Sequence, residues 1–220
     1  MKYPDKFHLT PEQNLFLAKK KWDENVYCGM KMENRNVTFP QTKTILDGIN
    51  VPDVKLNDIY AIKNMRNAWE FFFSTINEPI TLEYFCKLNE YIAIDEALVW
   101  VALRTGVVEI SGTDYKPPIP NTEEVRGGMS EILNSNSTAT EKALSIFSWG
   151  TRGQFFWDGN KRTSLILANK VLIENGAGMM IIPEKQMLKF NEVLSDYYNT
   201  SNKESLEDFL YNEAICGIEF

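Results

Sequence analysis

Apolar residues recur every three or four positions along most of the chain, which is the spacing of one buried face of an amphipathic helix. The pattern is clearest from Leu15 through Trp22 towards Met32, and from Ile59 to Trp69. It predicts a mainly α-helical protein. The helices expected from this spacing cover about 11–32, 57–74, 81–97, 184–198 and a short stretch opened by 201–204.

Capping sequences predict where several helices begin. The segments 10–13, 121–124 and 138–141 each place Thr or Asn three residues before Gln or Glu. This is the capping-box arrangement, in which the first side chain and the fourth satisfy each other's backbone N–H groups. We therefore expect helices from about residues 122 and 139, the second of which ends near Gly150 or Gly153.

One stretch of the sequence is apolar nearly all round a helix. Residues 165–168 and 171–173 are almost entirely aliphatic, and Gly176 follows at a position suited to end a helix. A helix without a polar face has to be surrounded by protein. We expect this helix to be the buried centre of the fold.

The only strand signal lies between residues 104 and 120. Val107–Ile110 is rich in β-branched residues, and a Ser111-Gly112 turn signal and a proline-rich segment follow. An isolated hairpin is not stable unless it rests on something larger. Asp47–Asp53, with a glycine and a proline, is the best candidate for a linker, and it divides the chain into an N-terminal helical arm (1–50) and a core (51–220) that could pack as one domain.

Composition limits the class of protein. The chain has 220 residues, 44% of them hydrophobic, and a formal net charge of −7. The acidic balance argues against nucleic-acid binding, which needs clustered cations. No apolar run is long enough to cross a membrane, and no signal peptide precedes the first helix. Cys28, Cys86 and Cys216 are scattered, so we expect free, buried thiols in a cytoplasmic protein, and His8, the only histidine, is expected on the surface.

The densest chemistry lies in residues 154–163, which read Gln-Phe-Phe-Trp-Asp-Gly-Asn-Lys-Arg-Thr. Gly159 and Asn160 tolerate positive φ, so the backbone N–H groups can turn towards one point at the start of the next helix. The helix dipole favours an anion there, and Lys161 and Arg162 add positive charge. Asp158 could hold Mg²⁺ that also contacts the phosphate. The segment predicts a site for a nucleotide phosphate.

This segment resembles the signature of the Fic (Fido) family, His-x-Phe-x-(Asp/Glu)-Gly-Asn-(Gly/Lys)-Arg-x-x-Arg. Phe156, Asp158, the Gly159-Asn160 pair, Lys161 and Arg162 match it. The resemblance implies the helical Fic fold with a small β-hairpin flap at residues 104–120, on which a target protein docks. It also implies ATP or another nucleotide with Mg²⁺, transfer of AMP or a related group to a protein side chain, and Phe156 as a buried anchor of the loop.

Two positions depart from the signature. Gln154 stands where the catalytic His belongs, and Leu165 stands where the second Arg belongs. A glutamine amide cannot accept a proton at neutral pH, so Gln154 can only orient a nucleophile, and loss of a general base typically costs about 10²–10⁴ in rate. Three functions stay open: a weak or altered transferase, a catalytically inactive binding module of Fic fold, and a phosphotransferase toxin of the Doc type, which Lys161 favours.

Glu33 is a candidate for regulation. Inhibited Fic proteins carry Ser/Thr-x-x-x-Glu-Gly/Asn on a helix that places the Glu against the second Arg of the signature. Here Glu33 and Asn34 match, whereas Gly29 stands at the Ser/Thr position. Because Leu165 replaces the Arg, a plain helix end at Asn34 is the alternative interpretation.

Overall fold

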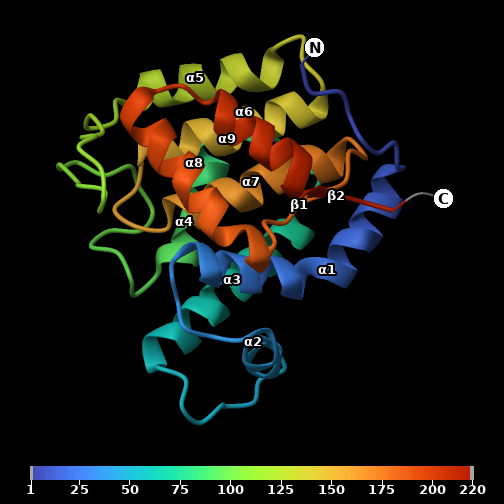
Figure 1. The fold of residues 1–220 in the computed structure, drawn as a ribbon, viewed down its shortest axis with the longest axis vertical. Helices are drawn as coiled ribbons and strands as arrows, with labels where there is room; N and C mark the ends of the chain where they lie inside the picture. Colours follow the sequence, from blue (N-terminus) through green and yellow to red (C-terminus); the bar gives the residue numbers. More distant parts are fainter. Residues whose placement is uncertain (1, 219–220) are drawn as a thin grey trace.

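Helix α7 (Asn160–Glu174) is the centre of the fold. The structure is a computed structural model that describes residues 2–218. Every residue of α7 except Lys161 and Glu174 is buried, as the apolar sequence predicted. Helices α1 (Pro11–Met32), α3 (Leu56–Ser74), α4 (Leu82–Ala93) and α6 (Ala139–Gly153) all pack against it (Figure 1).

The close packing of α6 on α7 depends on a small residue. A Cβ atom added at Gly150 would overlap the Ser164 side chain, so only glycine lets the two backbones approach this far. The two helices are joined directly by residues 154–159. The turn that carries the candidate chemistry is therefore held between two buried helices.

Most helix starts follow the caps expected from the sequence. Thr10 and Thr138 form complete capping boxes with Gln13 and Glu141, and Asn121 accepts from two N–H groups of α5 (Thr122–Asn134). Helix α2 (Phe39–Leu46) was not predicted, although Thr38 and Gln41 form a third capping box. α2 is short, and it packs on α1 and α3 at the lower end of the molecule in Figure 1.

The helix expected at 81–97 is α4, and its predicted end near residue 97 is wrong. α4 stops at Ala93, Ile94 is extended, and Asp95 takes a left-handed conformation with φ of 62°. The turn redirects the chain so that Glu96 points back towards α7, where it pairs with Arg162.

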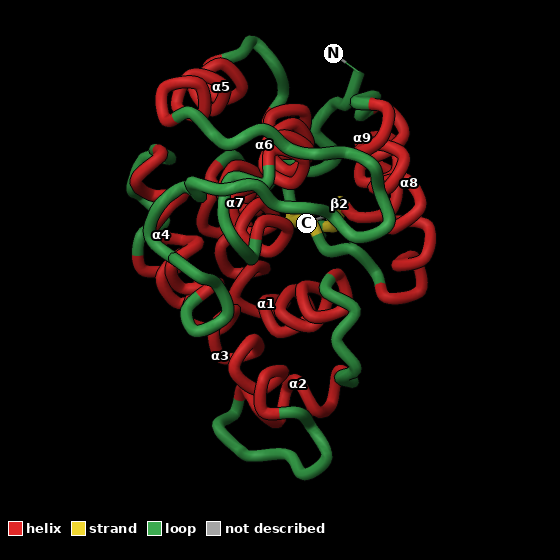
Figure 2. The backbone as a smooth tube through the Cα atoms, turned by 90° about the vertical axis from the view of Figure 1, so that its left-hand side faces the viewer, coloured by secondary structure: helices red, strands yellow, loops and turns green. Residues whose placement is uncertain are grey.

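The expected strand at Val107–Ile110 is not formed. This segment is irregular, although the turn at Ser111-Gly112 is present, with φ of 82° at the glycine. The whole connection from α4 to α5 crosses the face of the molecule in front of α6 and α7 (Figure 2). We call residues 104–120 the flap. The flap lies over the turn between α6 and α7, as expected, but its residues form no β-strands.

The small sheet lies elsewhere. β1 (Met179–Met180) pairs antiparallel with β2 (Ile215–Cys216), in the register Met179 to Cys216 and Met180 to Ile215. Between the strands come a 3₁₀ turn (Glu184–Gln186), α8 (Met187–Thr200), α9 (Glu204–Phe209) and a π-helical turn (Leu210–Ala214). The two C-terminal helices expected from the sequence are thus both present.

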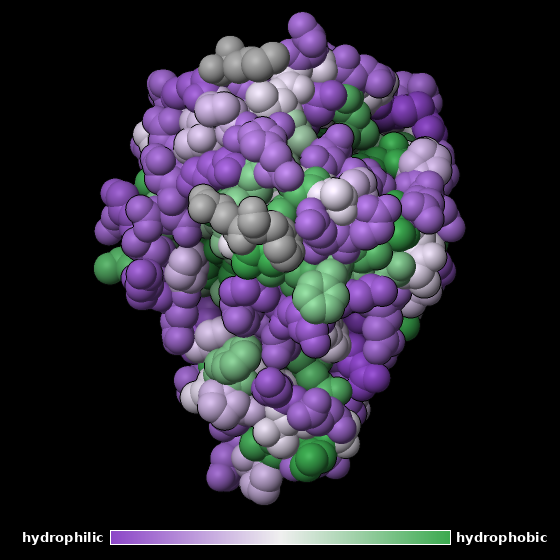
Figure 3. Space-filling view, turned by 90° about the vertical axis from the view of Figure 1, so that its right-hand side faces the viewer, coloured by the Kyte–Doolittle hydropathy of each residue, from purple (hydrophilic) through white to green (hydrophobic). Residues whose placement is uncertain are grey.

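The expected boundary near residue 50 falls in the loop between α2 and α3. α1, on the N-terminal side of this boundary, packs directly on α7 and so contributes to the same core. The side of the molecule that carries the C-terminal end shows mostly hydrophilic side chains with small apolar areas between them (Figure 3). Within residues 2–218, no helix is both long enough and apolar enough to span a membrane.

Candidate functional site

The turn between α6 and α7 needs two left-handed residues. Gln154 ends α6 with φ of 45°, and Gly159 precedes α7 with φ of 75°. A Cβ atom at Gly159 would lie 2.6 Å from Ile92 Cγ2, so a larger residue would be both strained and crowded. Glycine is therefore required at position 159, whereas Asn160 is not left-handed and already belongs to α7.

The side chain of Asn160 holds the turn together. Its Oδ1 accepts from the Phe156 N–H at 2.9 Å, and its Nδ2 donates to the Phe156 carbonyl at 2.9 Å and to Gln154 Oε1 at 3.2 Å. Asn160 is buried, and these bonds use its amide. Its side chain thus shapes the loop, and what it can offer a ligand is its backbone N–H.

Phe156 anchors the loop from below, at the position expected for it. The ring is fully buried and meets Phe85 edge-on, with 4.8 Å between ring centroids. Asn89 on α4 donates to the Asp158 carbonyl at 2.9 Å and to Thr163 Oγ1 at 3.1 Å. α4 therefore fixes both the middle of the turn and the first turn of α7.

The N-terminus of α7 offers backbone donors to an anion. The N–H groups of Asn160, Lys161 and Arg162 precede the first intrahelical bond, in which Thr163 donates to the Gly159 carbonyl at 2.8 Å. The Gly159 N–H donates instead to Asp158 Oδ1. Three oriented N–H groups at the positive end of a helix dipole are the usual elements of a phosphate site.

Lys161 and Arg162, the two cations of the signature, are already paired with carboxylates. Lys161 Nζ lies 3.2 Å from Glu33 Oε2 and donates to the Met32 carbonyl at 2.7 Å. Arg162 is 1% exposed and pairs with Glu96 at 3.1 Å and with Asp158 at 3.2 Å. Burial by itself would lower the pKa of Arg162, but the surrounding carboxylates outweigh this effect and raise it.

Glu96 was missed by sequence reasoning. It bridges Arg162 to Arg35, which follows α1 and also pairs with Asp58 at 3.0 Å. The partners come from four separate segments, and no local pattern joins them. Arg162 therefore has a structural role below the loop, and Lys161 is the signature cation that is nearer to solvent.

Glu33 lies at the site, although not against the residue that the resemblance implied. Its carboxylate contacts Lys161 at 3.2 Å and approaches Arg162 Nε at 3.7 Å. Leu165, at the position of the second signature Arg, is fully buried in the core. The Glu33 carboxylate thus faces Lys161 and Arg162, and no cation stands at position 165.

A cavity of about 430 Å³ opens above this turn. It is bordered by Glu33, by flap residues 109–113, by Gln154 and Lys161, and by α8 through Tyr198. The side chain of Gln154 is held at its rim, because Nε2 donates to the Thr151 carbonyl at 2.7 Å. Burial raises the pKa of Tyr198, so its hydroxyl is no substitute for a missing base.

Arg104 ties the flap to the turn, a role that the sequence did not indicate. Its guanidinium is 1% exposed and donates only to backbone carbonyls of Gln154, Gly106, Pro117 and Pro118. Its own N–H donates to the Phe155 carbonyl at 2.9 Å. One side chain thereby joins both stems of the flap to the residue at the catalytic His position.

Gly106 makes a second close contact between flap and turn, because a Cβ atom there would overlap the Trp157 ring. The flap thus lies directly against the turn at two places.

The residues partly fit the magnesium nucleotide that the sequence suggested. Asp158 has a side chain 43% exposed and one oxygen engaged by Gly159 and Arg162, so the other oxygen can face a cation. No group of three metal-ligating side chains occurs among the described residues. Mg²⁺ commonly takes one or two carboxylates together with waters and phosphate oxygens, so one carboxylate is enough only if a nucleotide is bound too.

Comparisons with known proteins agree with this architecture. Residues 79–172 match the family model described as "Fic/DOC family", and no curated protein matches the chain. Fic-1 (residues 134–508) from C. elegans superposes with a TM-score of 0.78 at 16% identity, covering 89% of this chain and 60% of that one. This chain therefore spans less than two thirds of that structure.

Two bacterial structures are similar as well. A Fic domain containing signaling protein from Bacteroides thetaiotaomicron gives a TM-score of 0.71 at 20% identity and covers 92% of this chain and 86% of that one. A Fic family protein from Desulfovibrio desulfuricans gives a TM-score of 0.74 at 15% identity and covers 91% and 64%. The protein has the Fic fold, and its residues 79–172 carry the Fic/DOC family segment.

Proposed function

We propose that this Fic-fold protein binds ATP or another nucleotide, with Mg²⁺, at the turn 158–162, and transfers a nucleotidyl or other phosphate-containing group weakly to a protein side chain. The main support for this proposal is the set of backbone N–H groups of residues 160–162. These groups lie at the start of the buried helix α7, beside the Lys161 side chain and under a cavity of about 430 Å³. A helix N-terminus with a lysine beside it suits a phosphate.

Each residue of the turn has a separate role in this proposal. Asn160 and Phe156 fix the turn, Gly159 permits its shape, and the N–H groups with Lys161 hold the phosphates. Asp158 would hold Mg²⁺, and the metal would supply positive charge beside the phosphates. Arg162 acts indirectly, because its ion pairs with Glu96 and Asp158 keep the start of α7 in place.

In nucleotidyl transfer, the oxygen of a target hydroxyl forms a bond to the α-phosphorus of ATP. The bond from that phosphorus to the bridging oxygen breaks, and pyrophosphate leaves. Gln154 cannot take up the hydroxyl proton, so the proton has to pass to solvent. Because stabilisation of charge on the phosphates does not depend on a base, slow transfer can persist.

Glu33 restrains the site in this proposal. A carboxylate 3.2 Å from Lys161 competes with a phosphate for the same cation. Its negative charge also repels the phosphate. Glu33 would have to turn away before a nucleotide binds fully. Helix α1 ends at Met32, and Asn34 has φ of 54°, so Glu33 lies just outside the regular helix.

The flap is the proposed docking surface for the target protein. Val107 and Ile119 at its two stems are 67% and 51% exposed. A target protein that docks on the flap would cover both side chains. The missing strand ladder fits this role, since a target segment could supply the partner strand.

A catalytically inactive binding module is the second candidate function. Two observations favour it: the amide of Gln154 is bonded to Thr151 and Asn160, and both signature cations are paired internally. In that case a nucleotide would bind and stay intact.

Labelled ATP separates the two functions. The protein and a cell extract are incubated with Mg²⁺ and ATP labelled on either the α- or the γ-phosphate, and labelled proteins are detected on a gel. Transfer of the α-label supports nucleotidyl transfer, and transfer of the γ-label alone supports a phosphotransferase. Binding of ATP without transfer of either label supports the inactive module, and absence of binding contradicts the proposal as a whole.

A further inference from the structure

Both cations at the start of α7 have carboxylate partners. Lys161 lies 3.2 Å from Glu33, and Arg162 lies 3.1 Å from Glu96 and 3.2 Å from Asp158. Arg162 is buried together with its partners, so Lys161 is the cation of this helix that a ligand can reach. A chain of phosphates that extends beyond Lys161 and the three N–H groups therefore meets negative charge.

The next turn of α7 adds no positive charge. Leu165 stands four residues after Lys161, and residues with this spacing lie on the same side of a helix. The Leu165 side chain is fully buried in the core. The place that a third cation of the signature would take is thus filled by an aliphatic group.

Among the described residues, the wall of the cavity above the turn adds no cation to Lys161. The charged residues of its lining are Lys161, Glu33 and Glu109. Glu109 lies 3.8 Å from Lys116, a neighbouring cation of the flap, so this pair contributes no net charge. The cavity as a whole is therefore close to neutral.

Uncharged polar side chains form much of the remaining wall. They come from the end of α1, from the flap and from α8, and they are Asn34, Ser111, Thr113, Asn191 and Ser195. Amide and hydroxyl groups both donate and accept hydrogen bonds. This wall suits the hydroxyl and ring-nitrogen groups of a nucleoside better than it suits further phosphates.

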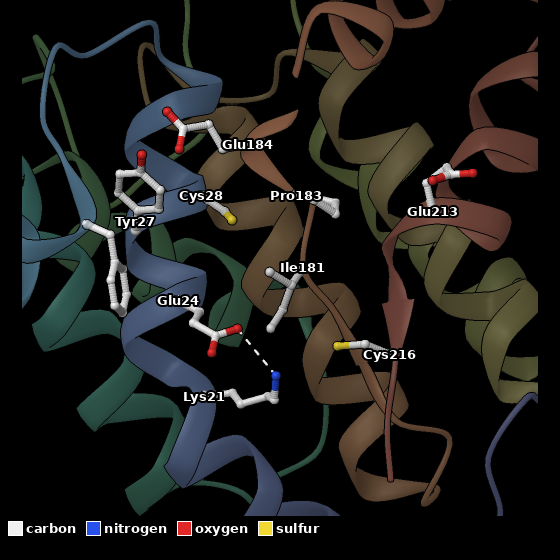
Figure 4. Close-up of a pocket in the computed structure, with 10 residues that line it drawn as sticks. Lys21, Glu24, Tyr27, Cys28, Ile181, Pro183, Glu184, Glu213 and Cys216 are labelled. Carbon is white, nitrogen blue, oxygen red and sulfur yellow. Dashed lines mark hydrogen bonds and ion pairs between the residues drawn. The ribbon is translucent and has the colours of Figure 1, made fainter. Parts of the chain in front are cut away.

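Cations in the surrounding elements already have partners. Lys21 lines a separate cavity of about 450 Å³ on another side of α1, where it pairs with Glu24 at 3.3 Å (Figure 4). Arg35 is held by two carboxylates. Arg152 lies over the Tyr115 ring at 3.9 Å and donates to two carbonyls of α8.

We propose that the preferred ligand of the site is a nucleoside diphosphate, free or esterified at its second phosphate, rather than a nucleoside triphosphate. This inference rests on the nucleotide site proposed above and specifies its ligand. The N–H groups of residues 160–162 and the Lys161 side chain hold two phosphates, and the uncharged wall faces the nucleoside. A third phosphate brings further negative charge to a site whose other cations are already paired.

The transfer step stays balanced with such a ligand. The oxygen of the target hydroxyl forms a bond to the α-phosphorus, and the bond from that phosphorus to the bridging oxygen breaks. Phosphate, or a phosphate monoester, leaves in place of pyrophosphate. The hydroxyl proton passes to solvent, as it does with a triphosphate.

AMP, ADP and ATP, each with the same excess of Mg²⁺, test the preferred number of phosphates. We expect ligand-observed NMR titration to show ADP binding about 3- to 10-fold more tightly than ATP, because the third phosphate adds repulsion without a cation. AMP should bind more weakly than ADP, since it lacks the second phosphate. ATP binding as tightly as ADP, or more tightly, would overturn the proposal and leave the nucleotide site in place. Absence of binding by all three would contradict the nucleotide site itself.

Glu109→Lys tests the cause of the preference. The Glu109 side chain is 80% exposed and borders the cavity, so the substitution adds a cation to the wall and releases Lys116. We expect it to raise the affinity for ATP about 3- to 10-fold more than that for ADP. Glu123→Lys makes the same change of charge on α5, outside the cavity and at an 83% exposed side chain, and should leave the ratio unchanged. An unchanged ratio in Glu109→Lys, or an equal shift in both variants, would overturn the proposal.

Discussion

Glu33, at the end of α1, forms a 3.2 Å ion pair with Lys161 in the first turn of α7. A cation at a helix N-terminus is unfavourable unless an anion accompanies it. Here the protein supplies its own anion, and that carboxylate occupies the cation that would otherwise face a phosphate. The same contact that stabilises the resting protein therefore limits nucleotide binding.

Removal of this carboxylate should strengthen nucleotide binding. For Glu33→Gly and Glu33→Gln we expect the affinity for MgATP to rise about 10-fold, or ~1.4 kcal/mol, because Lys161 is released and a repulsive charge is lost. Isothermal titration calorimetry measures this. Glu192→Gln, which breaks the exposed Lys189–Glu192 pair on α8, is the matched control. An unchanged or weaker affinity in both Glu33 variants would show that Glu33 does not compete with the ligand.

The Arg104 guanidinium should be required for an ordered flap. Arg104→Met removes the donors to four backbone carbonyls and leaves buried acceptors unpaired, so we expect unfolding to become easier by about 2–4 kcal/mol. Arg104→Lys keeps the charge without the planar fork, so its free energy of unfolding should fall between those of the wild type and Arg104→Met. Arg126→Lys, in an exposed pair with Glu83, is the control.

Hydrogen exchange shows whether Arg104 holds the flap in particular or stabilises the whole protein. In Arg104→Lys, amides of residues 105–116 should exchange faster while those of α3 and α7 keep their protection. Uniformly faster exchange across the whole protein would show that Arg104 does not act on the flap in particular.

Restoring a base should raise transfer activity. His tolerates the left-handed conformation found at position 154, and its unperturbed pKa near 6.5 leaves a neutral, basic fraction at pH 7. In a Glu33→Gly background we expect Gln154→His to increase α-label transfer by up to about 10²-fold. Adding Leu165→Arg should abolish folding rather than help, because the position is fully buried. No gain from Gln154→His, with MgATP still bound, would favour the inactive module.

The thiols should react slowly and in a pH-dependent way. Burial raises the pKa of Cys86 to about 11 and of Cys28 to about 12, and it raises that of Cys216 as well. Because the thiolate is the reactive form, alkylation of all three should be slower at pH 8 than that of free cysteine and should rise about tenfold per pH unit from 7 to 9. A rate that levels off below pH 9 at any of them would contradict this environment.

Features that depend on neighbouring residues could be predicted from the sequence. The caps at Thr10 and Thr138, the buried helix α7 and the Gly159-Asn160 turn all follow from a few adjacent side chains. Helix α2 has the same kind of signal, because Thr38 and Gln41 form a capping box at its start.

Features that depend on distant partners could not be predicted. Val107–Ile110 has the composition of a strand, but a strand needs a partner, and Arg104 holds this segment as an irregular loop instead. Glu96 meets Arg162 only because α4 ends early at Ala93. The resemblance places Glu33 against the second signature Arg, whereas its actual partner, Lys161, depends on the packing of α1 against α7.

The most direct test of the nucleotide site is a crystal structure of the Glu33→Gly variant grown with millimolar ATP and Mg²⁺. We expect a nucleotide in the cavity of about 430 Å³, with phosphate oxygens within hydrogen-bond distance of the N–H groups of residues 160–162 and Mg²⁺ on Asp158. A cavity without nucleotide at saturating ATP, or a nucleotide bound with its phosphates away from the start of α7, would contradict it.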